Sequence, residues 1–226
     1  FHRLDMDPLI ALALPPSYEV PGDPAEQKTR SQLGHPLAFF RDVAGIALDR
    51  IQVVWPEARE YFGRLVYAVC YLPDAEFRSC SASRYTGVIL ISNRDCSVLD
   101  LEESLVHEAG HQLLYNIAEA DPVTDDSSDE QYRLPWSGRM RDFYGYVHAF
   151  YIYVLLAQYH ERVMGCRAGP DGDFAAERVR HIVRGLVAAL PDFQTNPHLT
   201  PRGRVLMDAL ALDVAGLERR NRGLIA

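Results

Sequence analysis

An uncharged segment over residues 143–159 most constrains what this chain can fold into, because it must be covered either by lipid or by protein. Its length is close to what a membrane-spanning helix needs. It also contains five tyrosines and His148, and polar groups at mid-depth in a bilayer are costly. We therefore expect a buried helix over residues 142–164, in a fold with enough other elements to cover it.

The composition fits a folded domain of this kind. The chain has 226 residues, which is long enough for one domain with a substantial core. A net charge of −8 without a basic stretch argues against nucleic acid and membrane surfaces as partners, and favours a cationic peptide or a metal ion. The four cysteines show no C-x-x-C spacing, which indicates reduced thiols in a cytoplasmic protein.

Hydrophobic spacing and turn residues predict the order of the elements. We expect an irregular, proline-rich arm over residues 1–35, helices over 36–52 and 56–62, and strands over 64–72, 76–83 and 85–92. A helix over 100–120 and a polar loop over 121–140 precede the buried helix, and further helices follow over 174–190 and 202–219. The expected fold class is α+β, mainly α. It is a single domain over 1–226, with a small sheet in the first half, a buried helix pair and C-terminal helices within 167–226.

The helix over 100–120 contains an H-E-x-x-H motif, His107-Glu108-Ala109-Gly110-His111. Residues i and i+4 lie on one face of a helix, so the two imidazoles can bind one divalent metal ion. Glu108 points about 100° away from His107 and can reach the water or the groups beside the ion. The surrounding residues are apolar, which makes uncompensated histidines costly and favours metal binding.

A third ligand is needed, and several residues compete for the role. Glu119 follows the motif closely, Glu130 lies in an acidic loop, and Glu161 comes late on the next long helix. We favour His148, because two neighbouring antiparallel helices could bring it against the motif. A core histidine bonded to a tyrosine is the alternative reading of His148.

Residues near His148 suggest a place for a small acidic ligand. Arg141 precedes His148 by seven positions, about two helical turns, so a helix would place both on one face roughly 10 Å apart. An arginine there could bind the far carboxylate of a metal-chelating 2-oxo acid, with Arg139 as a weaker candidate. Tyr144 and Tyr151 would line the same face. Arg141 could equally be a surface residue in the first helical turn, capped by Asp142.

These motifs resemble a known family, the HExxH-motif peptide-modification proteins encoded beside ribosomal peptide natural-product genes. The resemblance covers roughly residues 86–160 and rests on three segments: 105–114, Pro135-Trp136, and Arg141-x-x-x-Gly145-x-x-His148. Where the family has Arg-Pro after its tryptophan, this chain has Arg141-Asp142.

The resemblance implies an iron(II)- and 2-oxoglutarate-dependent dioxygenase that hydroxylates the β-carbon of a residue in a precursor peptide. By that analogy His107, His111 and His148 hold iron and Arg141 anchors 2-oxoglutarate. Glu108 would act beside the metal. A carboxylate as ligand, from Glu108 or Glu161, stays open because many oxygenases use two histidines and one carboxylate.

Two other classes of function remain. In a zinc metallopeptidase, His107 and His111 would bind zinc and Glu108 would be the general base. In a peptide-binding module with a structural metal, the acidic loop over 121–130 would bind a basic peptide, although such loops are usually only solvated.

Overall fold

The computed structural model describes residues 2–3, 37–72, 77–92, 94, 97–125, 127 and 129–225. The chain forms two compact units, Phe1–Gln112 and Leu113–Ala226, and the boundary falls inside one long helix. The fold is α+β and mainly helical, with a small sheet in the first half, as predicted. The expectation of one catalytic domain over the whole chain stays a prediction.

The first unit combines short strands with helices. Its elements are β1 (His2–Arg3), α3 (Leu37–Val54), α4 (Pro56–Leu65), β2 (Ala68–Tyr71), β3 (Ser79–Ser81), the 3-10 turn η2 (Ser83–Tyr85), β4 (Val88–Ile91) and most of α5 (Val98–Ala120). Of the predicted irregular arm, the described residues 2–3 form strand β1, and the remainder lies outside the described residues.

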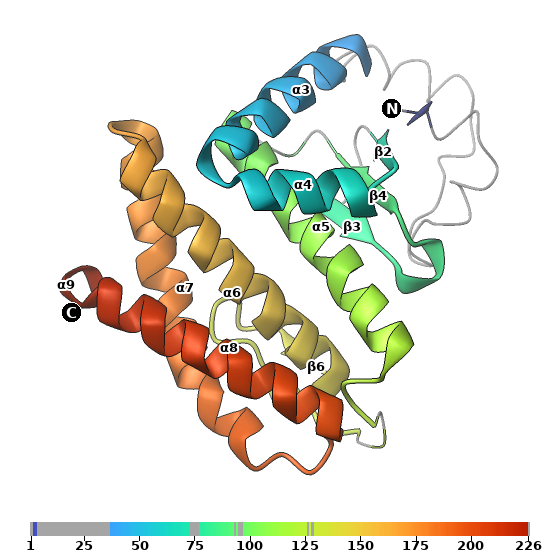
Figure 1. Ribbon diagram of the computed structural model, residues 1–226, viewed down its shortest axis with the longest axis vertical. Helices are drawn as coiled ribbons and strands as arrows, with labels where there is room; N and C mark the ends of the chain where they lie inside the picture. The colour runs from blue at the N-terminus through green and yellow to red at the C-terminus, as the bar shows by residue number, and fades with distance from the viewer. Residues whose placement is uncertain are drawn as a thin grey trace. The chain divides into compact units, whose positions relative to one another are not determined.

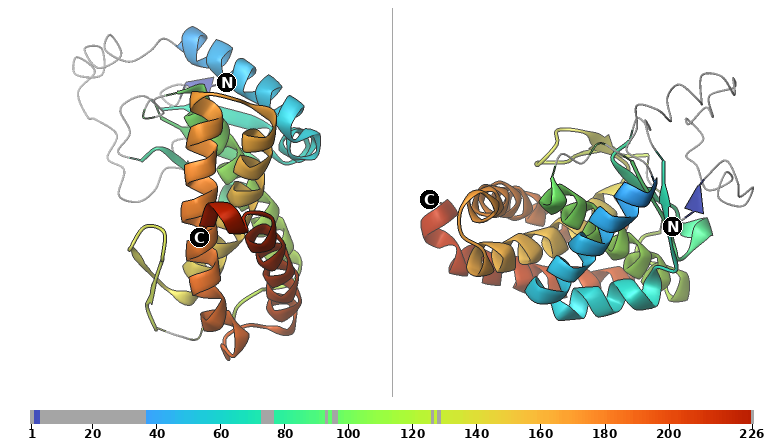
Figure 2. Two further views of the ribbon diagram at one scale, coloured as in Figure 1. Left: turned by 90° about the vertical axis from the view of Figure 1, so that its left-hand side faces the viewer. Right: turned by 90° about the horizontal axis from the view of Figure 1, so that it is seen from above.

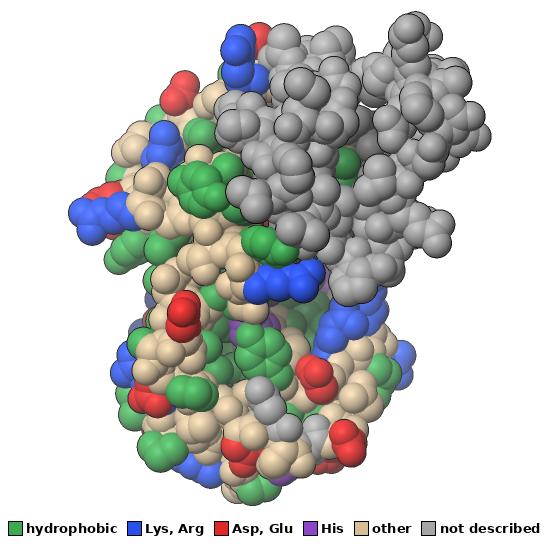
Figure 3. Space-filling model, turned by 90° about the vertical axis from the view of Figure 1, so that its right-hand side faces the viewer, with side chains coloured by type: hydrophobic (Ala, Val, Ile, Leu, Met, Phe, Trp, Pro, Cys, Tyr) green, Lys and Arg blue, Asp and Glu red, His purple; other side chains and the backbone are tan. Residues whose placement is uncertain are grey.

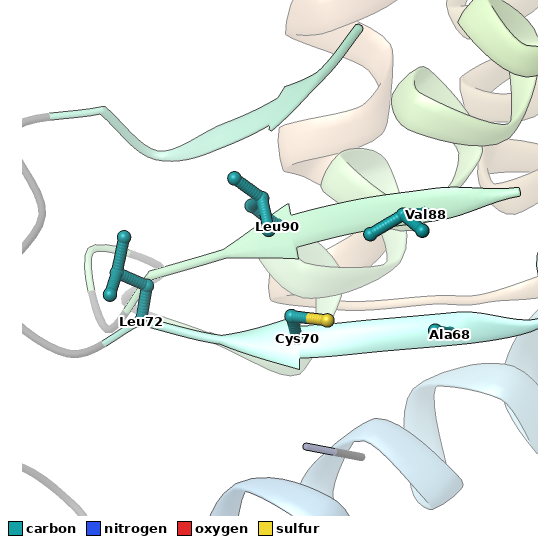
Figure 4. Close-up of a cluster of buried hydrophobic side chains, with 5 residues drawn as sticks. All are labelled: Ala68, Cys70, Leu72, Val88 and Leu90. Carbon is teal, nitrogen blue, oxygen red and sulfur yellow. The ribbon is translucent and has the colours of Figure 1, made fainter. Parts of the chain in front are cut away.

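The sheet of the first unit has the order β1-β2-β4-β3 among the described residues. β2 lies parallel to β1 and β4, whereas β3 is antiparallel to β4 at one end of the sheet. Every residue of β2 and β4 is buried, which is typical of parallel strands covered on both faces. Figure 4 shows one buried cluster on these strands, formed by Ala68, Cys70, Leu72, Val88 and Leu90.

Helix α5 begins slightly earlier than the sequence predicted. The Ser97 hydroxyl accepts a hydrogen bond from the backbone N–H of Asp100 at 3.1 Å, which satisfies one of the amides exposed at the helix start. Further along, Glu102 is fully buried and forms an ion pair of 2.6 Å with Arg50 of α3. The sequence predicted an apolar helix, and the structure adds buried polar side chains that tie it to its neighbours.

The second unit contains the remaining helices and a small hairpin. Its elements are β5 (Tyr132–Arg133), β6 (Met140–Arg141), α6 (Phe143–Cys166), α7 (Pro170–Gln194), α8 (Pro201–Arg220) and α9 (Arg222–Ile225), and all three predicted long helices are present. α6 and α7 lie side by side along their lengths (Figures 1 and 2). The β5–β6 hairpin lies in the segment that the sequence analysis treated as a polar loop.

Packing around α6 confirms that the uncharged segment is a buried helix. Tyr146 and Phe150 of α6 are fully buried and pack against Phe193 of α7, with ring centroids 4.7 and 4.8 Å away. Burial of each such ring contributes about 2–3 kcal/mol. Among the described residues, none of the helices is both long and apolar enough to cross a membrane.

Two helix starts in this unit are capped by side chains. Asp142 caps α6 by accepting a hydrogen bond from Gly145 N at 2.7 Å. Thr200 caps α8 by accepting from Gly203 N at 3.0 Å, with Pro201 as the first helical residue. Gly203 also allows close approach of the chain, because a β-carbon there would collide with the carbonyl oxygen of Val123.

Candidate metal centre

The two histidines of the motif lie one turn apart on α5. Their ring centroids are 4.9 Å apart and their planes meet at 65°. Metal–nitrogen bonds of about 2.1 Å place the ring centroids of two imidazoles on one ion roughly 5 Å apart. Both side chains are half-buried, so the pair is supported by the fold and still accessible to an ion. The pair thus fits two of the ligands of a divalent metal.

Glu108 is directed toward the sheet. Its side chain is 2% exposed, and its Oε2 accepts a hydrogen bond of 2.7 Å from the Ser81 hydroxyl of β3. Burial, and then the negative charge of Glu108, raise the pKa of the neighbouring Cys80 thiol to about 11. The carboxylate of the motif is therefore held against strand β3.

Gln112, four residues after Glu108, ties the same face of α5 to β4. Its side-chain oxygen accepts from Gly87 N at 2.8 Å, and its amide nitrogen donates to the carbonyl of Val88 at 3.2 Å. Gly87 has a φ of +84°, and a β-carbon there would collide with the ring of Tyr67, so glycine is required at this turn. These contacts fix the rotation of α5 about its axis.

His148 lies in a different setting, among aromatic rings of the second unit. It is 5% exposed, with its ring centroid 4.2 Å from that of Tyr144 and 5.3 Å from that of Tyr115. Tyr144 therefore lies beside His148 as predicted. Tyr151, the other tyrosine predicted on this face, is also buried.

The expected placement of Arg141 on a helix is wrong. Arg141 belongs to β6, and α6 begins only at Phe143 after the Asp142 cap, so Arg141 and His148 do not share a helix face. The Asp142 cap was expected from the sequence, but the backbone before it belongs to the hairpin and not to a helical turn. Arg141 and Arg139 are both exposed, and each could still bind an anionic ligand from the hairpin.

The acidic alternatives for the third ligand are occupied or exposed. The Glu161 carboxylate accepts from the Arg220 guanidinium at 2.8–3.2 Å and from Asn221 at 2.6 Å, which commits it to a surface ion pair. Glu130 is exposed and accepts from the Tyr132 hydroxyl, and Glu119 is exposed at the end of α5. These contacts make Glu161 a poor candidate for a metal ligand.

The acidic loop is attached to the start of α8. Asp125 N donates to the carbonyl of His198, and His198 Nδ1 lies 3.1 Å from Asp125 Oδ1 and 3.0 Å from Ser127 Oγ. Hydrogen bonds from Ser127, and then from His198, hold the pKa of the Asp125 carboxyl below its usual value. Ser127 and Asp125 both contact Nδ1 of His198, whereas in a nucleophilic triad the serine and the carboxylate contact different nitrogens of the imidazole. We therefore interpret this group as a structural contact that attaches the loop to the segment before α8.

The predicted metal ligands divide between the two units, with His107 and His111 in one and His148 in the other. Within the parts of the chain that the structure describes, no three His, Cys, Asp or Glu side chains are grouped as a metal site. A cavity of about 430 Å³ in the second unit lies along α7 beside Arg180, His181 and Arg184, and none of the predicted site residues lines it. The three-histidine site remains a prediction.

Two residues that the sequence analysis did not single out are central to the observed geometry. Ser81 and Gln112 fix the Glu108 face of α5 against β3 and β4. Ser81 lies 27 residues before Glu108 and belongs to no recognisable motif. The only sequence signal for this contact was the predicted strand over 76–83, which could pack near the helix.

The sequence matches no protein-family model and no curated protein. On the face drawn in Figure 3, basic and acidic side chains are interspersed over the described surface. Because neither comparison returns a match, the roles of the residues of the centre are inferred from their chemistry and from the resemblance of the motifs.

Proposed function

We propose that this protein is an iron(II)- and 2-oxoglutarate-dependent dioxygenase that hydroxylates the β-carbon of a residue in a ribosomally made precursor peptide in the cytoplasm. The observation that carries the proposal is the pair of half-buried imidazoles, 4.9 Å apart, on a helix whose rotation is fixed by buried hydrogen bonds. The motif resemblance over roughly residues 86–160 supplies the choice of iron and cosubstrate.

In this proposal His107, His111 and His148 hold the metal ion. Bound iron with 2-oxoglutarate would supply the activation of oxygen and the oxidation of a C–H bond. Support for His148 comes from its contact with Tyr115, which lies on the same helix as the motif and four residues after His111. Neutral imidazoles with aromatic neighbours suit a site from which water must be kept away.

Other residues of the chain would bind and orient the reactants. The exposed guanidinium of Arg141, or that of Arg139, binds the far carboxylate of 2-oxoglutarate through charged hydrogen bonds. The Tyr144 and Tyr151 hydroxyls orient this ligand. Glu108, with one oxygen already bonded to Ser81, remains beside the metal and accepts a proton or a hydrogen bond from the substrate side.

A zinc metallopeptidase is the second candidate, and one observation favours it. Glu108 is a buried carboxylate next to a pair of metal-binding histidines, which is the arrangement that activates a zinc-bound water for hydrolysis. The resemblance of the motifs over roughly residues 86–160 favours the dioxygenase over this second candidate.

One assay separates the two candidates. The full chain is loaded with Fe(II) without oxygen, given 2-oxoglutarate and candidate peptides, and then exposed to O₂, or is loaded with Zn(II) in parallel. The proposal expects O₂-dependent succinate with a peptide product heavier by one oxygen atom, and loss of succinate formation in Arg141→Ala. Peptide cleavage with zinc and no succinate with iron would instead establish the peptidase.

A further inference from the structure

The carboxylate of the motif and its two imidazoles leave α5 in different directions. Glu108 and Gln112 are four residues apart and both bond to the sheet, Glu108 to β3 and Gln112 to β4. His107 and His111 each precede one of these residues, and successive side chains on a helix are about 100° apart. The imidazole face is therefore turned away from the face that contacts the sheet.

The Ser81 hydroxyl determines where the Glu108 carboxylate rests. Glu108 is 2% exposed, so its oxygens are largely removed from water and depend on protein donors. An ionised carboxylate only accepts hydrogen bonds, so at 2.7 Å Ser81 must be the donor and Oε2 the acceptor. Without this donor the carboxylate would lose a charge-assisted hydrogen bond, and a cation bound by the adjacent histidines would offer a replacement for it.

We propose that Ser81 is a positioning residue that holds the Glu108 carboxylate on β3 and out of the coordination sphere of the metal that His107 and His111 bind. This inference rests on the proposed metal centre and applies to both candidate functions. Removal of the hydroxyl lets the glutamate rotate and ligate the metal, which adds a negatively charged oxygen to the ligand set and closes a position that a substrate would occupy.

The test uses Co(II) as the probe, because its visible absorption reports the number and type of its ligands. The chain offers a matched pair at this position. Ser81→Thr keeps the hydroxyl and Ser81→Val has the same shape without it, and both β-branched residues suit a strand. Ser79→Ala, on the same strand, is the control for loss of a serine that does not contact Glu108. Circular dichroism checks that each variant is folded.

The proposal expects wild type, Ser81→Thr and Ser79→Ala to give one Co(II) spectrum, and Ser81→Val to give a different spectrum with about tenfold tighter Co(II) binding. The double variant Ser81→Val with Glu108→Gln should return to the wild-type spectrum, because the neutral amide is a poor ligand. An unchanged spectrum in Ser81→Val overturns the proposal while leaving the metal centre intact. If wild type binds no Co(II), or if its Co(II) binding does not depend on His107 and His111, both the role of Ser81 and the proposed metal centre are overturned.

Discussion

The two long buried helices, α5 and α6, hold their polar side chains in different ways. On α5 the buried Glu102, Glu108 and Gln112 each bond to a partner on another element. On α6 the ring centroid of the buried His148 lies 4.2 Å from that of Tyr144, and the ring centroid of the buried His160 lies 5.6 Å from that of Tyr159. The directional bonds of α5 fix its rotation on the sheet, and the packed rings beside His148 leave that imidazole only 5% exposed. The difference therefore separates a motif whose orientation is set by hydrogen bonds, on α5, from a histidine with an aromatic setting, on α6.

The largest expected effect concerns the metal-binding face of α5. We expect His107→Ala and His111→Ala each to weaken binding of Fe(II) or Zn(II) by more than about 100-fold, roughly 3 kcal/mol, because each removes a direct ligand. Metal content after dialysis and competition titration measure this effect. His181→Gln, which changes an exposed histidine of α7, is the control and should bind metal as wild type does. Equal binding by all three variants would show that α5 holds no metal.

The next effect tests whether hydrogen bonds fix α5 on the sheet. Gln112→Leu leaves Gly87 N and the Val88 carbonyl buried without their partner, so we expect the free energy of unfolding to fall by about 2–4 kcal/mol. Urea unfolding of this variant and of Glu119→Gln, an exposed position on the same helix, provides the comparison. The control should stay within about 0.5 kcal/mol of wild type. If Gln112→Leu also lowers the free energy of unfolding by no more than about 0.5 kcal/mol, packing alone positions α5.

A smaller effect tests a strong hydrogen bond between α6 and α7. The Tyr146 hydroxyl donates to Asp192 Oδ2 at 2.7 Å, so Tyr146→Phe should lower the free energy of unfolding by about 1 kcal/mol at pH 7. Burial, and then the hydrogen bond to Asp192, raise the pKa of Tyr146 above its ordinary value. Above pH of about 10 the unfolded chain loses this proton before the folded protein does, so this contribution is lost as pH rises.

Urea unfolding between pH 7 and 10.5 measures this dependence. Wild type should lose stability more steeply than Tyr146→Phe above pH of about 10, because the phenylalanine variant has no proton to release there. Tyr61→Phe changes an exposed tyrosine of α4 and should follow wild type. Parallel slopes for wild type and Tyr146→Phe would contradict the contact.

The smallest effect concerns the thiol beside Glu108. With a pKa of about 11, Cys80 should be alkylated by iodoacetamide at pH 8 much more slowly than the exposed Cys166. Glu108→Gln removes the nearby charge and should speed alkylation of Cys80 several-fold, with no change at Cys166. Mass spectrometry of the digested protein gives both rates. If Glu108→Gln leaves the alkylation rate of Cys80 unchanged, the Glu108 carboxylate does not lie near the Cys80 thiol.

The helices could be predicted from the sequence because their signals are local. Apolar spacing and start signals such as Thr200-Pro201, which caps α8, depend on residues within a few turns of one another. The β5–β6 hairpin was missed, since its two-residue strands lie in a polar segment without a run of apolar residues. The placement of Arg141 failed for the same reason, because this residue belongs to the undetected strand β6, which directly precedes the Asp142 cap of the helix.

The site could be predicted only in part. The motif places His107 and His111 on one face because the spacing of a helix is fixed, and the structure shows the two rings close together. The contact of Glu108 with Ser81 depends on how a strand and a helix pack, and no periodic pattern encodes such a pair. The third ligand and the bound cosubstrate also depend on packing over long separations in the chain.

In the proposed centre, three imidazoles from His107, His111 and His148 bind one iron ion. X-ray absorption at the iron edge of the anaerobic Fe(II) protein tests it most directly, because scattering from the imidazole rings counts the histidine ligands. We expect three imidazoles in wild type, two in His148→Ala, and three in the control His181→Gln. Two imidazoles in both wild type and His148→Ala would contradict the three-histidine centre.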